Sequence, residues 1–181
     1  GGQVRLEGYT LASDEVTAGE ILQLNLFWEA TNVIQRRYKV FTHVIDGAGH
    51  LVGQRDAEPG GGVRFTNTWR EGEHLVDRYG LPILPGTPPG EYLIEVGMYN
   101  PDDGLRLPVV AGGKAVADHV VLQSVRVTRP SGPPPLAALD MQHRQHIRGG
   151  DIDLLGFSFS KLGAAHAGLQ PLKPHDVAEL V

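Results

Sequence analysis

The sequence predicts an all-β fold of about eight short antiparallel strands, and we favour a sandwich over a barrel. Three features lead to this prediction. Apolar and polar residues alternate in several short segments, which is typical of strands with one buried face. The 181 residues include 24 glycines and 13 prolines, enough for many tight turns. The chain shows no convincing amphipathic helix and no regular alternation of strands and helices.

Residues 91–100 form the clearest predicted strand, because every second residue from Tyr92 to Met98 is apolar. Residues 38–45 are apolar on both faces, which indicates a central strand covered on both sides. Turn signals such as Asp46-Gly47 separate these segments. The predicted strands are 4–11, 21–28, 38–45, 51–56, 74–83, 91–100, 105–110 and 120–128.

The character of the chain changes after residue 128. Residues 130–135 read Pro-Ser-Gly-Pro-Pro-Pro, a semi-rigid spacer that cannot enter a sheet ladder. The polar residues that follow are expected to be exposed, either as a turn of helix or as extended chain. We therefore predict three parts. They are a β-sandwich domain over 1–129, a proline-rich linker over 130–148, and the truncated start of a second, repeated β-sandwich domain over 149–181.

An internal repeat supports the second copy. Residues 1–11 and 149–159 share the pattern Gly-Gly, polar, β-branched, polar, Leu, any residue, Gly, aromatic. A weaker match then joins 16–20 with 172–176. Two strands alone cannot bury an apolar face, so we expect this tail to dock on the first domain or on a neighbouring molecule, by strand addition or swapping. The apolar residues that need cover are Leu154, Leu155, Phe157 and Phe159.

Composition argues against several partners and sites. The net charge is −5 and the basic residues are not clustered, so nucleic acid is not expected as a partner. The chain has no cysteine, which excludes disulfides, thiolate nucleophiles and iron–sulfur ligation. No apolar run approaches the roughly 18 residues that span a bilayer, so this segment is not expected to insert into a membrane.

Five segments in order carry a resemblance to a known module. They are LFWEA at 26–30, VFTHVID at 40–46, QRD at 54–56, TWREGE at 68–73 and PGEYLIEVGMY at 89–99. Over roughly residues 3–128, and in part 150–180, the chain resembles the immunoglobulin-like sandwich at the C-terminal, extracytoplasmic end of bacterial membrane glycosyltransferases of the dolichyl-phosphate-mannose mannosyltransferase type. The resemblance implies an immunoglobulin-like fold and a location outside the cytoplasm. It brings no catalytic or ligand residues, because the catalytic acids of such transferases lie in their membrane-embedded part.

Exposed aromatic rings beside acids and amides would suit a sugar. Trp69 lies between a polar loop and a charged run, where its ring either stacks on a sugar or packs over an edge of the sandwich. Tyr99, with the neighbouring Asp102 and Asp103, is the other candidate. The same two aspartates also fit a tight turn that hydrogen-bonds its own backbone. The candidate sugar-binding residues are Trp69, Tyr99, Asp102 and Asp103.

No catalytic residue, metal ligand or cofactor is expected. His43 lies mid-strand between apolar neighbours and is interpreted as a hydrogen-bonded core histidine. Asp102 and Asp103 follow Asn100 too closely to form a calcium loop, which has a longer series of oxygen ligands. The serines lack the Gly-x-Ser-x-Gly context of a nucleophile elbow.

These observations favour a non-catalytic, extracytoplasmic domain that acts as a structural or interaction module of a larger membrane-anchored, glycosyltransferase-like protein. Its expected partners are other domains of the same polypeptide and, through the tail, a second copy. The alternative is a carbohydrate-binding module that presents sugar to an attached glycosyltransferase. A third hypothesis is a sandwich enzyme, which would need a cleft with converging titratable groups. A buried Trp69 would favour the structural hypothesis, and an exposed one the sugar-binding hypothesis.

Overall fold

The computed structural model describes residues 2–133, 135–139, 141–161 and 178–180. The chain divides into two compact units, Gly1–Pro134 and Pro135–Val181. No helix in these described ranges is long and apolar enough to cross a membrane.

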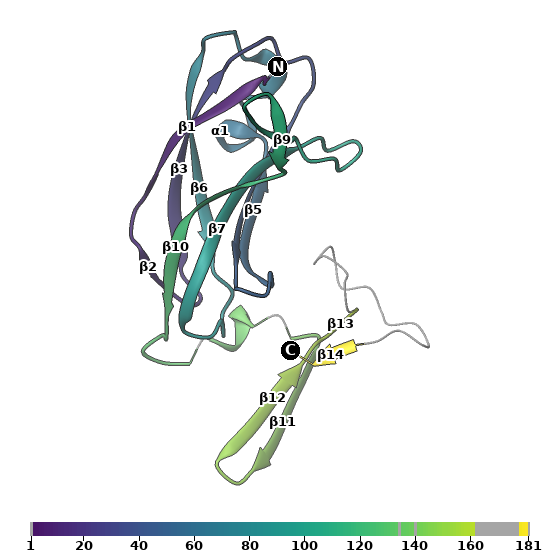
Figure 1. Cartoon of the computed structure of the whole chain (residues 1–181). Helices are drawn as coiled ribbons and strands as arrows, with labels where there is room; N and C mark the ends of the chain where they lie inside the picture. Colours follow the sequence, from purple (N-terminus) through teal and green to yellow (C-terminus); the bar gives the residue numbers. More distant parts are fainter. Residues whose placement is uncertain (1, 134, 140, 162–177, 181) are drawn as a thin grey trace. The chain divides into compact units, whose positions relative to one another are not determined.

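The first unit is a sandwich of two β-sheets (Figure 1). One sheet has three strands in the order β1-β3-β6, and the other has five in the order β2-β10-β7-β4-β5. All neighbours are antiparallel except β2 and β10, which are parallel. The strands are β1 (Val4–Leu11), β2 (Glu15–Thr17), β3 (Ile21–Ala30), β4 (Lys39–Ile45), β5 (Leu51–Ala57), β6 (His74–Pro82), β7 (Gly90–Tyr99) and β10 (Val120–Thr128). The predicted all-β sandwich is confirmed.

The strand order is that of an immunoglobulin-like domain, in which strands A, B and E face a sheet containing C, F and G. A second feature of that fold is present where β7 begins. The hydroxyl of Tyr92 donates a hydrogen bond to the backbone oxygen of Pro88 at 2.8 Å, closing the corner between β6 and β7. This bond anchors the proline-rich turn that the sequence places before β7.

Period-two alternation explains the core between the sheets. On β3, Leu22, Leu24, Leu26 and Trp28 are buried while their neighbours face outward. β7 contributes a matching face. The buried residues of β7 are Tyr92, Ile94, Val96 and Met98.

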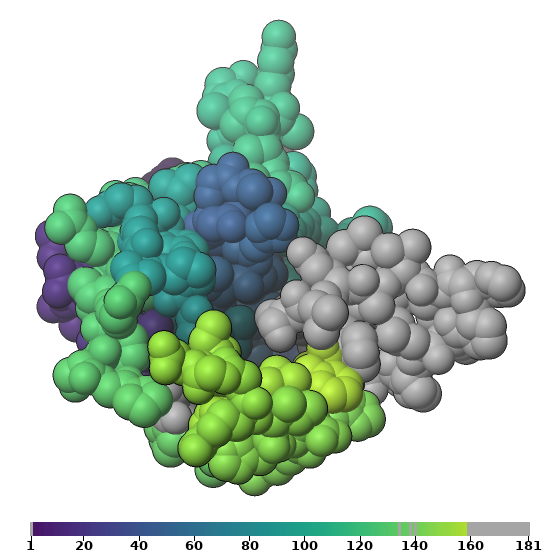
Figure 2. Space-filling model, turned by 90° about the horizontal axis from the view of Figure 1, so that it is seen from below, coloured from purple at the N-terminus to yellow at the C-terminus, as the bar shows by residue number. Residues whose placement is uncertain are grey.

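The segment after β7 differs from the prediction of a strand over 105–110. A short hairpin forms instead from β8 (Val109–Ala111) and β9 (Lys114–Ala117). Gly112 and Gly113 make its turn at positive φ values of 57° and 79°, which other residues rarely adopt. Figure 2 shows this hairpin standing out from the sandwich. The expected glycine-rich loop contains α1 (Pro59–Gly62), an irregular turn, followed by a 3₁₀ turn at Thr66–Thr68.

The described residues of the second unit form a 3₁₀ turn at Leu136–Ala138 and four strands. β11 (His143–Gly149) and β12 (Ile152–Phe157) form an antiparallel hairpin, and β13 (Phe159–Lys161) pairs with β14 (Ala178–Leu180). β11 therefore occupies the end of the range predicted as linker, where we expected a turn of helix or extended chain. The weak repeat match at 172–176 lies outside the described residues.

Candidate functional site

Loops from separate parts of the first unit meet at one end of the sandwich. They connect β3 to β4, β5 to β6, and β7 to β8. In the variable domains of antibodies, the ligand-binding loops lie at the corresponding end of the sandwich. Between them lies an open depression of about 800 Å³, which we call the loop-end hollow. Its lining residues are Gln35, Arg36, Arg37, Lys39, Glu58, Asn67, Asn100, Pro101, Asp102 and Asp103.

One wall of the loop-end hollow is a turn organised by Asn100, which is buried. The amide nitrogen of Asn100 donates to Asp103 Oδ2 at 2.9 Å, and its oxygen accepts from the Asp102 backbone N–H at 3.1 Å. Asp103 Oδ1 in turn accepts from the Leu105 backbone N–H at 2.9 Å. The turn thus hydrogen-bonds itself, as the Asx pattern predicts. The carboxylates of Asp102 and Asp103 remain on the exposed rim.

The opposite wall carries an ion pair. Arg37 donates from Nε to Glu58 Oε1 at 3.0 Å, and its guanidinium lies 3.8 Å above the ring of Phe65. The other carboxylate oxygen, Oε2 of Glu58, is buried and has no hydrogen-bond partner in the described part of the chain. Thr66 connects this wall to the β3–β4 loop. Its hydroxyl donates to the Arg36 carbonyl at 2.9 Å and accepts from the Tyr38 N–H at 2.9 Å.

Trp69 does not line the loop-end hollow. It is only 4% exposed and belongs to the core of the sandwich. Its indole Nε1 donates to the Arg64 carbonyl at 3.1 Å, and its backbone N–H donates to the Thr66 carbonyl at 3.1 Å. A buried ring has no face open to a sugar in solution, so this arrangement favours the packed alternative for Trp69.

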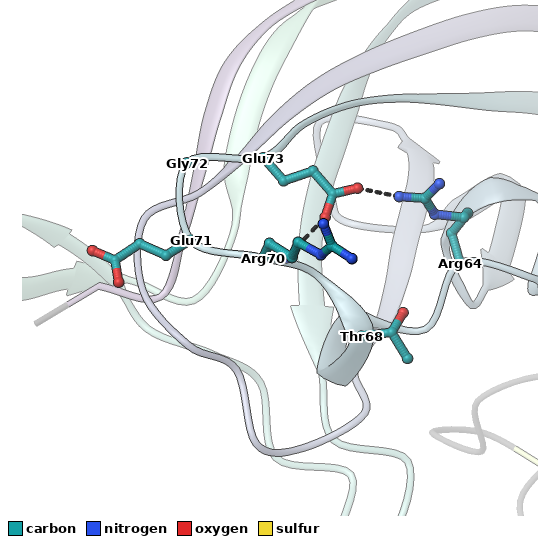
Figure 3. Close-up of a pocket in the computed structure, with 6 residues that line it drawn as sticks. All are labelled: Arg64, Thr68, Arg70, Glu71, Gly72 and Glu73. Atoms are coloured by element: carbon teal, nitrogen blue, oxygen red, sulfur yellow. Dashed lines mark hydrogen bonds and ion pairs between the residues drawn. The ribbon is translucent and has the colours of Figure 1, made fainter.

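The charged residues around Trp69 line a second open depression of about 610 Å³ (Figure 3). Glu73 occupies its centre, forming an ion pair with Arg64 and accepting from the Arg70 backbone N–H at 2.8 Å. The backbone hydrogen bond from Arg70, with the charge of Arg64, lowers the pKa of Glu73. Glu71 points away from this group. The carboxylate at the centre of this depression is therefore already paired with a guanidinium.

Tyr99 lies half-buried on the outer face of the five-stranded sheet, opposite Lys39 on β4. Its ring centroid is 6.5 Å from that of Phe41. Burial, with smaller contributions from the carboxylates of Asp56 and Glu58, raises the pKa of Tyr99. Of the four predicted sugar-binding residues, Asp102 and Asp103 therefore share the loop-end hollow, while Trp69 and Tyr99 lie elsewhere.

The same outer face carries a group that sequence reasoning missed. His119 pairs with Glu95 at 3.2 Å and with Asp118 at 2.7 Å, and the hydrogen bond from His119 lowers the pKa of Asp118. Buried His43 lies 3.5 Å from Asp56. Glu95 meets His119 through the pairing of β7 with β10, and His43 meets Asp56 through the pairing of β4 with β5, so no local motif signals these two contacts.

Arg106 also packs on this outer face and contacts Phe41 and Asp118. Its guanidinium lies 4.3 Å above the ring of Phe41 and donates to Asp118 at 3.2 Å. The contacts hold the segment between β7 and β10 against the outer face. Among the described residues, no three His, Cys, Asp or Glu side chains are arranged to hold a metal ion.

A buried carboxylate supports the loop that contains α1. Asp77 on β6 is 1% exposed and accepts from the Gly60 backbone N–H at 2.8 Å and from the Tyr79 hydroxyl at 2.6 Å. Burial raises the pKa of Asp77, although both hydrogen bonds oppose the shift. Burial and the neighbouring carboxylate also raise the pKa of Tyr79. This pair connects the core to the glycine-rich turn.

Comparison with known proteins identifies no family. No family model matches the chain, and no curated protein matches it. Several solved structures are similar in part, and three of them are named here. The alkylpurine DNA glycosylase AlkC of Pseudomonas fluorescens, bound to DNA containing an abasic site analogue, matches with a TM-score of 0.41 and 14% identity over 72% of this chain and 31% of that one. This chain thus spans about a third of the length of AlkC.

The other two structures are isolated domains. The C-terminal domain of wzt matches with a TM-score of 0.47 and 10% identity over 73% of this chain and 76% of that one. A CARDB domain of a Pyrococcus furiosus protein, in complex with di-metal ions, matches with a TM-score of 0.41 and 12% identity over 69% of this chain and 87% of that one.

Proposed function

We propose that this chain is a non-catalytic structural or interaction domain of a larger, extracytoplasmic, membrane-anchored protein of the glycosyltransferase type. The burial of Trp69 is the observation that carries the proposal. The ring best placed by sequence to meet a ligand packs in the core and hydrogen-bonds the Arg64 carbonyl. The five segments that resemble the extracytoplasmic module of membrane glycosyltransferases support the location and the parent protein.

Other titratable side chains also stabilise the fold. Asp77 anchors the Gly60 turn, Tyr92 closes the corner before β7, and His119 clamps the segment after β7 to the sheet. The contacts of Asp77 and His119 join separate elements, whereas that of Tyr92 closes a local turn. Such a domain presents rigid loops and edges to neighbouring domains of the same polypeptide, which we propose as its partners.

This proposal can be tested with the full chain. We expect no turnover of a panel of chromogenic glycosides and esters, and no saturable heat signal on titration with neutral and acidic oligosaccharides. Trp69→Ala should lower the melting temperature strongly, because truncating a buried Trp costs about 3–5 kcal/mol. Turnover by the intact chain, lost in a folded variant, would contradict the non-catalytic role.

A second candidate function is carbohydrate binding at the loop-end hollow. The observation in its favour is the mixture of amides, carboxylates and guanidinium groups that three loops bring together there, since such groups both donate to and accept from sugar hydroxyls. Asp102 and Asp103 offer acceptors on the rim, and Gln35 and Asn67 offer amides. This version of the hypothesis no longer needs Trp69.

Amide chemical shifts of the labelled full chain would test this candidate during oligosaccharide titration. Binding at the hollow would move signals around residues 35–39 and 100–105, and Asp102→Ala should weaken it about tenfold if one charge-assisted hydrogen bond is lost. Glu71→Ala, on an exposed residue that does not line the loop-end hollow, is the matched control. Unperturbed loop signals across the panel would exclude sugar binding at this place.

A further inference from the structure

The β8–β9 hairpin, residues 109–117, is exposed but carries almost no polar side chain. Its one polar residue is Lys114, and the other eight are valine, alanine or glycine. Val116 is 61% exposed and Val110 is 48% exposed. A hairpin with one side in water normally has a polar face, because its strands alternate polar and apolar residues. This hairpin stands out from the sandwich without such a face (Figure 2), so its side chains fit an apolar environment better than water.

The charge of this region differs from that of the whole chain. The chain carries a net charge of −5, yet residues 105–117 contain no acidic residue and two basic ones, Arg106 and Lys114. Arg106 donates to Asp118 and lies over the Phe41 ring, so it belongs to the sheet. Lys114 follows the glycine turn of the hairpin and is exposed. Its ammonium group can therefore contact an anionic group that lies beside the apolar side chains.

The N-terminus lies at the same end of the sandwich as the connection from β7 to the hairpin (Figure 1). β1 begins opposite Ala30, at the end of β3, and the connection leaves β7 after Tyr99, which stands opposite Lys39 at the start of β4. In the proposed parent protein, the module follows the membrane-embedded part, so the membrane anchor enters at the N-terminus. Such an anchor would hold the hairpin end of the sandwich toward the bilayer.

The form of the hairpin favours a bilayer over a protein partner. β8 has three residues and β9 has four, so strand addition along either edge would supply few hydrogen bonds. A protein surface covers one face of a hairpin and leaves the other face in water. The interfacial region of a bilayer surrounds a protruding segment, accepts apolar side chains at its boundary with the acyl chains, and offers phosphates to a lysine.

We propose that the β8–β9 hairpin docks on the surface of a phospholipid bilayer, with its valines at the acyl boundary and Lys114 among the headgroup phosphates. This contact is interfacial and differs from the bilayer-spanning insertion that the sequence argues against. Two valines and one lysine bind weakly by themselves, since even a single myristoyl chain binds only marginally. The inference therefore rests on the proposed function, in which the anchor of the parent protein raises the effective concentration of the hairpin at the bilayer.

The test attaches the full chain to vesicles through an N-terminal histidine tag and a nickel-chelating lipid, which replace the anchor of the parent protein. The chain has no cysteine, so Val116→Cys carries a single environment-sensitive fluorophore. On vesicles of phosphatidylcholine and phosphatidylglycerol, we expect blue-shifted emission and quenching by nitroxide groups on the lipids. Leu84→Cys with the same fluorophore is the control, because Leu84 is 47% exposed and precedes β7, whereas the hairpin follows that strand. The control label should emit as it does in solution.

Further substitutions separate the apolar and ionic parts of the contact. Val110→Asp should return the hairpin label to its solution emission, because a carboxylate at the acyl boundary is costly. Lys114→Glu should lower the ratio of docked to free hairpin at least about fivefold, the factor expected for one basic residue near an anionic surface. Leu84→Asp should leave the shift unchanged. All three positions are exposed, so circular dichroism should show an unaltered fold.

Three outcomes would overturn the docking hairpin. They are a hairpin label that keeps its solution emission on vesicles, a shift that survives Val110→Asp, and an equal shift of the Leu84→Cys label. A shift that appears without vesicles as the protein concentration rises would assign the hairpin to a second copy of the chain instead. None of these outcomes bears on turnover or sugar binding, which test the proposed function separately.

Discussion

The sandwich and the β11–β12 hairpin contain strands with one sequence pattern and opposite degrees of burial. On β1, Leu6 packs against the core, whereas its repeat counterpart Leu154 is 45% exposed. The pattern determines that each segment is a strand and which residues share its inward positions. It does not determine burial, because burial requires the strands that pair with and cover it. The comparison shows that the same strand pattern can occur in a buried and in an exposed strand.

The largest expected effect comes from truncating one leucine in each region. Leu24→Ala should lower the free energy of unfolding by about 2–5 kcal/mol, because Leu24 is fully buried between the sheets. Leu154→Ala should change it by no more than about 0.5 kcal/mol, as expected for an exposed position. Urea denaturation of both variants measures the difference. Equal losses at the two sites would show that the hairpin has a core of its own.

A smaller effect is expected on the outer face of the sandwich. A Cβ atom at Gly97 would lie 2.4 Å from Phe41 Cζ and 3.1 Å from the Asp118 carbonyl oxygen. Gly97→Ala should therefore destabilise the sandwich by about 1–3 kcal/mol through overpacking. Gly47→Ala is the control, because a Cβ there meets nothing within 4 Å. If both variants unfold like wild type, the Phe41 ring does not pack closely against Gly97.

The smallest expected effect depends on pH and on β1. His74 pairs with Glu7 at 2.8 Å, and this hydrogen bond, with the carboxylate charge, raises the pKa of His74 above its usual 6.5. The folded-state pKa is the higher one, so the stabilisation is fully present below pH 6.5 and is lost as pH rises through the raised value. In Glu7→Gln, the urea concentration at the midpoint of unfolding should depend less on pH over this window. An unchanged pH profile in Glu7→Gln would contradict the contact between β1 and β6.

The sequence was sufficient where a local pattern decides structure. Alternation predicted β3 and β7 with their buried faces, and the Asn100 turn formed as its Asx residues indicate. It was insufficient where distant segments decide. Trp69 has polar neighbours along the chain, yet its ring packs in the core, and the contacts of His119 form only when the sheet assembles. The hairpin at Gly112 was missed because its two glycines gave a turn signal without strong flanking alternation.

The central claim is that Trp69 supports the fold and does not contact ligand. The chain has two tryptophans, so Trp28→Phe leaves Trp69 as the sole indole reporter. We would measure its fluorescence emission and acrylamide quenching, with and without a panel of oligosaccharides. A buried Trp69 predicts blue-shifted emission and slow quenching that no sugar alters. Red-shifted, readily quenched emission that a sugar protects in a saturable way would contradict the account.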